Sequence, residues 1–168
     1  GAGRTALLLA VAGDRDATAL LLVRSGADVN AQAANRDTPW LLAGARGRTA
    51  VLAAMLDAGR VDYTIRNRYG GNALIPACER GHVEVVRYLL AESDVDVDHV
   101  NNLGWTGLLE AIILAEGDTA HQAIVRLLLE AGADPELPDR DGVTPLAHAR
   151  AKGQGEVVAI LLEAGATR

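Results

Sequence analysis

Alternating carboxylates at Asp94, Asp96 and Asp98 are the first feature of this chain that could do chemistry. Carboxylates at every second position supply the first three ligands of a calcium-binding loop, because Ca²⁺ prefers oxygen ligands. The rest of that motif is missing, since His99 stands where the loop requires glycine and Trp105 where it requires glutamate. The pattern therefore favours a solvated turn over a calcium site.

Other metal-ligating and nucleophilic residues are scattered. The histidines at positions 82, 99, 121 and 148 show no paired spacing that would direct them to one metal ion. The single cysteine, Cys78, excludes an internal disulfide and cannot build a zinc site alone. No phosphate-binding glycine loop and no nucleophile with an evident base is present. We expect no cofactor, no metal and no enzymatic activity.

Composition narrows the classes of partner. The 168 residues carry a formal net charge of −6, which argues against binding to nucleic acid or to anionic membrane surfaces. No apolar run approaches the roughly 18 residues that a membrane-spanning helix needs. The sequence predicts a soluble protein without membrane insertion. We expect a cytoplasmic location, or a periplasmic one if a signal peptide has been removed upstream.

Internal repetition shows how the remaining residues are positioned. The segment 140–149 recurs in degraded copies, and alignment on one polar position gives spacings of 33, 34, 34 and 38 residues. The aligned residues are Thr5, Thr38, Asn72, Thr106 and Thr144. A period of this length is typical of a repeat array, so five units fill the chain.

Each unit predicts a pair of helices, most plainly in the last copy. Thr144 can cap a helix that begins at Pro145, and Gly153 interrupts the apolar pattern. A second helix over 156–163 then ends before Gly165. One such pair buries too little apolar surface to offset its ordering entropy, so the pairs must stack on one another.

The copies resemble the ankyrin repeat, whose motif runs G-x-T-P-L-H-x-A, then G-H, then V-V-x-x-L-L, then G-A-D-V-N-A. The matching residues are Gly3, Thr5, Leu7, Ala10 and 26–31; Thr38, Pro39, Ala43 and Gly59; Gly70, Leu74, Ala77, 81–86, Leu89 and Leu90; Gly104, Thr106, Leu108, Ala111 and 132–134; and Gly142, Thr144, Pro145, Leu146, Ala149, Gly165 and Ala166. The chain is also similar to small bacterial stand-alone ankyrin-repeat proteins.

This resemblance implies one all-α domain over residues 1–168, an ankyrin-repeat solenoid of stacked helix pairs with β-hairpin-like turns. The repeats would cover approximately 1–32, 33–66, 67–100, 101–138 and 139–168. The fourth unit holds about five extra residues around 115–120, which predicts a longer and more mobile loop between its helices. Because the first helix at 7–11 is almost wholly apolar, we expect further residues upstream of Gly1, whereas Glu156, Glu163 and Arg168 suggest a finished C-terminal cap.

The resemblance also gives several polar residues a structural role. His82 and His121 align with the histidine of the G-H position, and Cys78 replaces a small residue, which implies a buried thiol. Glu110 and His148 occupy a position that is usually apolar, in successive repeats. We expect them to be stacked neighbours that satisfy each other or nearby backbone; the alternative is a pH-sensitive pair or part of a ligand site.

In ankyrin repeats the turn tips and the exposed face of the first helices line a concave groove. By alignment, the candidate partner-binding residues are Arg46, Arg68, Tyr69, Glu79, Arg80, Leu103, Trp105, Arg140 and Asp141, and the groove also includes Asn35, Asp37, Asn102 and Lys152. Tyr69 and Trp105 are large rings at turn positions, and rings and arginines dominate binding energetics at interfaces. The alternative is that both rings pack against the adjacent turn.

The resemblance therefore implies a non-enzymatic protein–protein interaction module, monomeric, that presents its groove to a protein or peptide. The groove would be centred on units three and four. A rival interpretation is a small-molecule sensor, in which the irregular fourth repeat forms a pocket from Trp105, Glu110 and His148.

Overall fold

The computed structural model describes residues 3–167, and this part of the chain contains ten helices and no strand. The first helices of the five units are α1 (Ala6–Ala12), α3 (Pro39–Ala45), α5 (Leu74–Glu79), α7 (Gly107–Ile113) and α9 (Pro145–Ala151). The second helices are α2 (Asp16–Arg24), α4 (Thr49–Asp57), α6 (Val83–Glu92), α8 (Thr119–Glu130) and α10 (Gly155–Glu163). The expectations for Gly1 and Arg168 lie outside the described residues.

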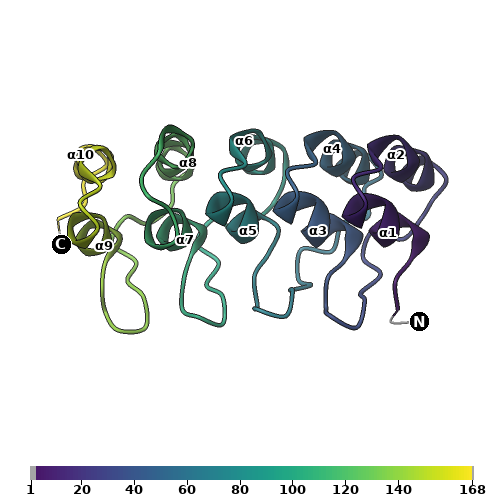
Figure 1. The fold of residues 1–168 in the computed structure, drawn as a ribbon, viewed down its shortest axis with the longest axis horizontal. Coiled ribbons are helices and arrows are strands. Elements are labelled where there is room, and N and C mark those ends of the chain that lie inside the picture. The colour runs from purple at the N-terminus through teal and green to yellow at the C-terminus, as the bar shows by residue number, and fades with distance from the viewer. Residues whose placement is uncertain (1–2, 168) are drawn as a thin grey trace.

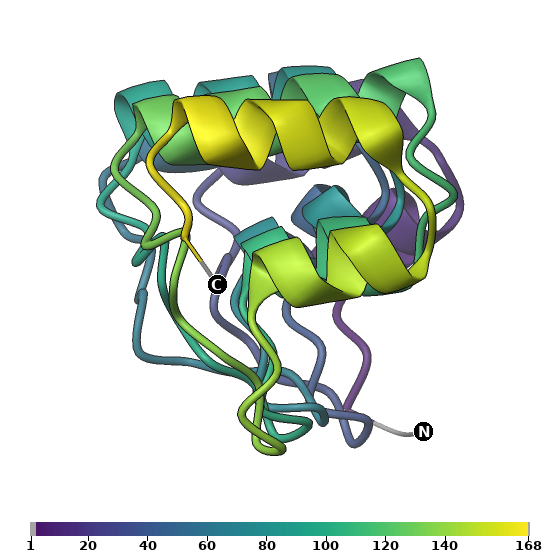
Figure 2. The ribbon, with the colours of Figure 1, turned by 90° about the vertical axis from the view of Figure 1, so that its left-hand side faces the viewer.

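The helix pairs stack side by side in chain order, with the two ends of the chain at opposite ends of the row (Figure 1). The second helices form one layer and the shorter first helices form the other. Seen along the row, the loops between units extend beyond the layer of first helices (Figure 2). The prediction of an all-α solenoid of stacked helix pairs is confirmed.

The residues on which the repeats align begin the first helices. The Oγ1 atoms of Thr5, Thr38, Thr106 and Thr144 each accept a hydrogen bond from the amide three residues later, at 3.1 to 3.3 Å. The Oδ1 atom of Asn72 accepts from two amides in the same way. Each side chain thus satisfies an amide that has no partner within its helix.

The turns that precede the first helices share one geometry. We call them fingers and number them by unit, so that the second to fifth fingers are residues 33–37, 67–71, 101–105 and 139–143. In each, the first amide donates to the fifth carbonyl and the fourth amide donates back to the first carbonyl, at 2.8 to 3.1 Å. Gly70 and Gly104, with φ of 74° and 86°, lack the Cβ that would collide with Asn102 and Arg140 of the following finger. The fingers therefore stack closely.

One continuous apolar core runs the length of the array. Two residues after each capping position stands a large buried side chain: Leu7, Trp40, Leu74, Leu108 and Leu146. Each first helix contacts the first helices of the neighbouring units, so these side chains form a row through the layer. Because the main contacts between helices lie within a unit or between successive units, stability depends on neighbouring pairs.

Hydrogen bonds between units also stabilise the stack. The Nε2 atoms of His82 and His121 lie 3.3 and 3.1 Å from the carbonyl oxygens of Ala45 and Glu79 in the preceding unit. Gln154 at the same repeat position donates to the carbonyl of Ala115 at 2.8 Å. The structural role predicted for the two histidines is confirmed.

The prediction of a longer loop in the fourth unit is correct only in part. Its loop has five residues, 114–118, and the corresponding loops of the other units have three. Helix α8 is longer as well, with 12 residues against 9 or 10 in the other second helices. The Oδ1 atom of Asp118 accepts from the amides of Ala120 and His121 and caps the helix. Most of the inserted residues therefore extend α8 at its N-terminus.

We expect Gly44→Ala to lower the free energy of unfolding by about 1.5 kcal/mol. A Cβ at this position in α3 would lie 2.5 Å from the carbonyl oxygen of Ala73, so the helices must separate, and overpacking costs about 1–3 kcal/mol. Helix propensity offsets part of this cost. Urea denaturation measures the change. In the control Gly155→Ala, at the start of α10 with open space around it, no loss is expected.

Candidate functional site

The fingers and the exposed side of the first helices form one continuous surface, which we call the finger face. A hollow of about 250 Å³ lies on it between α1, α3 and the second finger. Its lining residues are Arg4, Leu8, Leu9, Ala12, Asn35, Asp37, Leu42 and Arg46. Three of the groove positions expected from the alignment, Asn35, Asp37 and Arg46, thus surround a hollow with an apolar floor.

The third and fourth fingers present large side chains to solvent. Tyr69 is 53% exposed and Leu103 is 51% exposed, whereas Trp105 is half-buried. The guanidinium of Arg68 lies over the Tyr69 ring, 4.7 Å from its centroid. The amide of Asn102 donates to the carbonyl of Tyr69 at 2.8 Å and joins the two fingers. The two exposed apolar side chains therefore project from turns that are held in a fixed register.

The other candidate residues lie along the same face, and most of their charges have partners. Arg46 lies 3.6 Å from Asp14 in the preceding unit. Arg80 donates to the carbonyl of Ala45 at 2.7 Å, and its Nε lies 4.0 Å from Glu79. Lys152 donates to the carbonyl of Ile113 at 2.8 Å. Arg140 and Asp141, at the last finger, are both exposed.

Glu110 and His148 do not pair with each other, which corrects the expectation of a mutually satisfied pair. Asn101 Nδ2 donates to Glu110 Oε1 at 2.7 Å, and His148 Nε2 lies 2.8 Å from Asp139 Oδ2. Each side chain is held by the first residue of its own finger, nine positions earlier. The arrangement on which a small-molecule pocket in the fourth repeat would depend is therefore not formed between these two residues.

The two contacts also differ in their electrostatics. Burial, followed by the nearby charge of Glu79, raises the pKa of Glu110 from 4.5 to about 7. Burial also acts to raise the pKa of Asp139, but hydrogen bonds from the Val143 amide and from His148 outweigh it and leave that pKa lowered. Asp139 is therefore ionised beside its histidine at neutral pH, whereas Glu110 is partly protonated.

Cys78 is buried, as the sequence predicts, and desolvation of the thiolate raises its pKa. We expect the folded protein not to react with Ellman's reagent at pH 8, because the thiolate is disfavoured and the sulfur is inaccessible. Absorbance at 412 nm measures the reaction. One equivalent should react after unfolding in guanidinium chloride. Rapid reaction in native buffer would contradict this burial.

The three alternating aspartates belong to turns between units. Asp96 Oδ1 accepts from the amide of Asp98 at 3.1 Å, and the carboxylate of Asp98 accepts from the amide of Asp134 in the next unit, also at 3.1 Å. Within residues 3–167, no three His, Cys, Asp or Glu side chains are grouped to hold a metal ion. The structure thus gives Asp98 a role in joining successive units.

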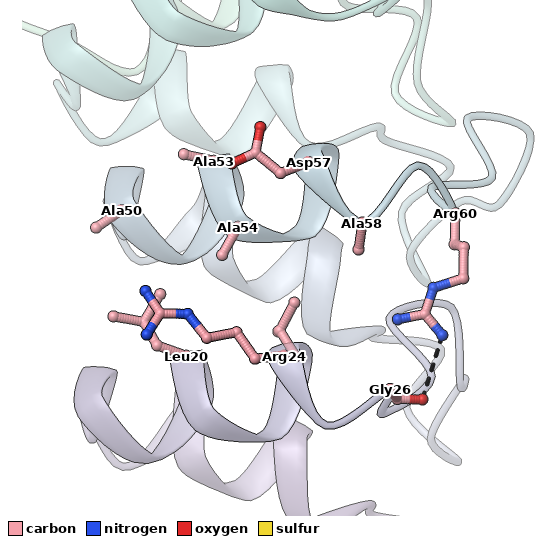
Figure 3. A pocket seen from close by; sticks show the side chains of 10 residues that line it. Leu20, Arg24, Gly26, Ala50, Ala53, Ala54, Asp57, Ala58 and Arg60 are labelled. Carbon is pink, nitrogen blue, oxygen red and sulfur yellow. Dashed lines mark hydrogen bonds between the residues drawn. The ribbon is translucent and has the colours of Figure 1, made fainter.

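A larger cleft, of about 790 Å³, lies on the opposite layer between α2 and α4 (Figure 3). Its walls include Ala50, Ala53 and Ala54, whose short side chains leave the space open. Arg60 is engaged at the end of the cleft, where it donates to the carbonyl of Gly26 at 3.2 Å. Arg24 and Arg60 also line this cleft, but its lining contains no ring. We favour the smaller finger-face hollow as the candidate site because the neighbouring fingers add the exposed side chains of Tyr69 and Leu103 to the same face.

Reasoning from sequence missed the part of the hollow that lies in unit one. Leu9 and Leu42 stand four residues after their capping threonines, the position that Glu110 and His148 occupy in later units. A row of side chains at this repeat position therefore runs along the floor of the finger face. The signal for the two leucines is their repeat position, which the alignment gives, whereas the polar residues at that position do not point to them.

Over residues 3–167, none of the helices has both the length and the apolar character that crossing a bilayer requires.

Comparison with known proteins shows the same repeat along the chain. The sequence profile described as "Ankyrin repeats (3 copies)" matches residues 7–101, 41–139 and 93–167. The ankyrin repeat protein YahD of Escherichia coli (strain K12) is 42% identical over 164 residues, which cover 98% of this chain and 81% of YahD.

Two solved structures have the same fold. The ankyrin repeat domain ABAYE2397 from Acinetobacter baumannii AYE superposes with a TM-score of 0.94 at 54% identity, covering 99% of this chain and 84% of that one. The ankyrin repeat protein EF0377 superposes with a TM-score of 0.94 at 44% identity, covering 96% and 81%.

Proposed function

The chain belongs to the ankyrin-repeat family, and from this premise we propose that it is a non-enzymatic recognition module whose finger face binds a protein or peptide. Ankyrin repeats generally mediate protein–protein interactions and form a non-enzymatic interaction fold. The proposed surface comprises Arg46, Arg68, Tyr69, Glu79, Arg80, Leu103, Trp105, Arg140 and Asp141, together with the hollow between units one and two.

One observation carries the proposal: two large apolar side chains, Tyr69 and Leu103, are about half exposed on adjacent fingers. Neither is needed to fill the core, and the backbone hydrogen bond between the fingers holds both in place. Rings and arginines that converge on one surface are typical of binding hot spots. Arg68 already lies on the Tyr69 ring, so a partner would meet a prearranged pair.

The rigidity of the fingers favours binding. Each finger is closed by two backbone hydrogen bonds, and Asn101 and Asp139 also accept two amides each from their own fingers. A surface that is ordered before binding loses little conformational entropy on association. A small set of exposed side chains can then give useful affinity.

The proposal is tested by affinity capture from a lysate of the source organism, followed by titration of any captured protein. The double variant Tyr69→Ser/Leu103→Ser should weaken binding at least about 30-fold, the effect of losing about 2 kcal/mol at a hot spot. The matched control is Leu21→Ser/Leu162→Ser, which removes apolar side chains that are 65% and 47% exposed on α2 and α10.

The control variant should bind as the unaltered protein does. If the finger-face variant retains its partner while the control loses it, the second-helix layer is the binding surface and the proposal is wrong. Circular dichroism of both variants verifies that the helices are intact.

A further inference from the structure

Charge is distributed unequally between the two halves of each unit. One half of each unit consists of the finger, the first helix and the turn after it. These halves are residues 3–14, 33–48, 67–82, 101–117 and 139–154. They contain nine Arg or Lys and seven Asp or Glu residues, whereas the remainder contains seven and fifteen. The net charge of −6 therefore combines a weakly basic finger side with a strongly acidic remainder. An acidic partner would be attracted to one side and repelled by the other.

Unpaired charge on the finger face is mostly positive. Arg4, Arg36, Arg68 and Arg140 form no ion pair within residues 3–167, and all four are exposed. Carboxylates on this side are largely held, since Glu110 is buried against Asn101 and Asp139 is held by His148. Guanidinium groups without an ion pair thus occur in the first, second, third and fifth units, whereas residues 101–117 of the fourth unit contain no Arg or Lys.

The hollow between units one and two combines two arginines with an apolar floor. Leu8, Leu9 and Leu42 line it, and Arg4 and Arg46 belong to the same lining. The Arg46 side chain is 42% exposed, and Asp14, its partner, also pairs with Arg48. A carboxylate from a partner can therefore approach Arg46 while an apolar side chain enters the hollow beside it.

Resting on the function proposed above, we propose that the finger face binds an acidic peptide segment with an apolar anchor. The anchor, of leucine or methionine size, occupies the hollow lined by Leu9 and Leu42. Carboxylates of the segment then pair with Arg4 and Arg46 beside the anchor and with Arg68 in the next finger. A polyanionic nucleic acid fits less well, because the hollow is apolar and Asp37 lines it.

A selection of random 12-residue peptides displayed on phage, with the purified chain as bait, tests the occupant. The enriched peptides should carry a net negative charge and share one large aliphatic residue. Synthetic copies of the best peptides, labelled with fluorescein, then provide defined probes for titration by fluorescence anisotropy. Affinity should fall at least tenfold between 50 and 500 mM NaCl, because the ion pairs are exposed to solvent.

Two pairs of variants locate the peptide. Arg68→Glu should weaken binding at least tenfold, whereas Arg87→Glu, at an exposed position of α6 in the opposite layer, should not change it. Ala12→Phe, which fills the hollow, should weaken binding similarly, whereas Ala53→Phe, which fills the cleft between α2 and α4, should not. Thermal unfolding of each variant verifies that its fold is retained.

The outcomes separate this inference from the proposed function. Enriched peptides that are neutral or basic, but still lost in Tyr69→Ser/Leu103→Ser, overturn the acidic partner and leave the finger face as the binding surface. If no enriched peptide loses affinity for the finger-face variants, both the acidic-peptide inference and the proposed function are overturned. Submicromolar binding of a 20-nucleotide single-stranded DNA that is abolished by Arg68→Glu identifies nucleic acid as the ligand and also overturns the acidic peptide.

Discussion

Replacement of Leu108 by alanine is expected to lower the free energy of unfolding by about 3 kcal/mol. The side chain is 1% exposed in α7 of the fourth unit, and its truncation leaves a cavity in the row of large residues that joins successive units. Both neighbouring units lose packing contacts, because α7 contacts α5 and α9. Urea denaturation followed by circular dichroism measures the change.

Leu103→Ala in the same unit is the matched control. This leucine lies on the fourth finger and is 51% exposed, so its truncation should alter the free energy of unfolding by less than about 0.5 kcal/mol. Leu103→Ala should instead weaken the binding of the protein or peptide partner. Equal stability losses in the two variants would show that the units are not joined through the row of buried first-helix residues.

Glu110→Gln is expected to raise the free energy of unfolding by about 2 kcal/mol at pH 8 and to leave it nearly unchanged at pH 4.5. The folded protein holds the Glu110 proton more tightly than the unfolded chain does, because burial raises the pKa from 4.5 to about 7. The stability of the unaltered protein therefore falls as pH rises through this interval. Glutamine keeps the acceptor for Asn101 without the charge. The full shift corresponds to at most about 3 kcal/mol, and the edge of the side chain that reaches solvent reduces this.

The measurement is urea denaturation of both proteins at several pH values between 4.5 and 8. The control is Glu116→Gln, which alters a carboxylate with a side chain that is 92% exposed, and its effect should not depend on pH. A pH-independent difference between Glu110→Gln and the unaltered protein would show that Glu110 ionises normally in the folded state.

The helix pairs could be predicted because the signals for them are local. Thr38 and Thr144 each precede a proline that suits the first helical position, and the structure shows both threonines capping their helices. The stacking of units followed from the period, because one pair cannot bury its apolar face alone. Cys78 and His82 were also placed correctly, since the repeat assigns each position an environment.

The contacts of Glu110 and His148 could not be predicted from repeat position alone. Both side chains had a competing partner, Asn101 or Asp139, nine residues earlier on the same finger. Stacking of neighbouring units indicates which residues are near each other, but it does not determine which of two polar partners is chosen. In the structure, Glu110 contacts Asn101 and His148 contacts Asp139, each within its own unit.

The insertion in unit four lengthens the loop by only two residues, for a different reason. Extra residues between two helices predict a longer loop when only the repeat length is considered. Asp118 is a strong N-capping residue, and the residues after it allow helix α8 to begin at Thr119. In the structure, α8 starts two residues before His121, whereas α6 starts directly after His82. Capping by Asp118 thus places the other inserted residues in the helix.

Site-specific photocrosslinking tests the central claim, that the finger face is the recognition surface, most directly. A benzophenone amino acid replaces Leu103 on the fourth finger in one protein and Leu21 on α2 in another, and both positions are more than half exposed. After irradiation in cells of the source organism, we expect a discrete crosslinked protein from position 103 and none from position 21. A crosslink to the same protein from position 21, with none from position 103, would contradict the account.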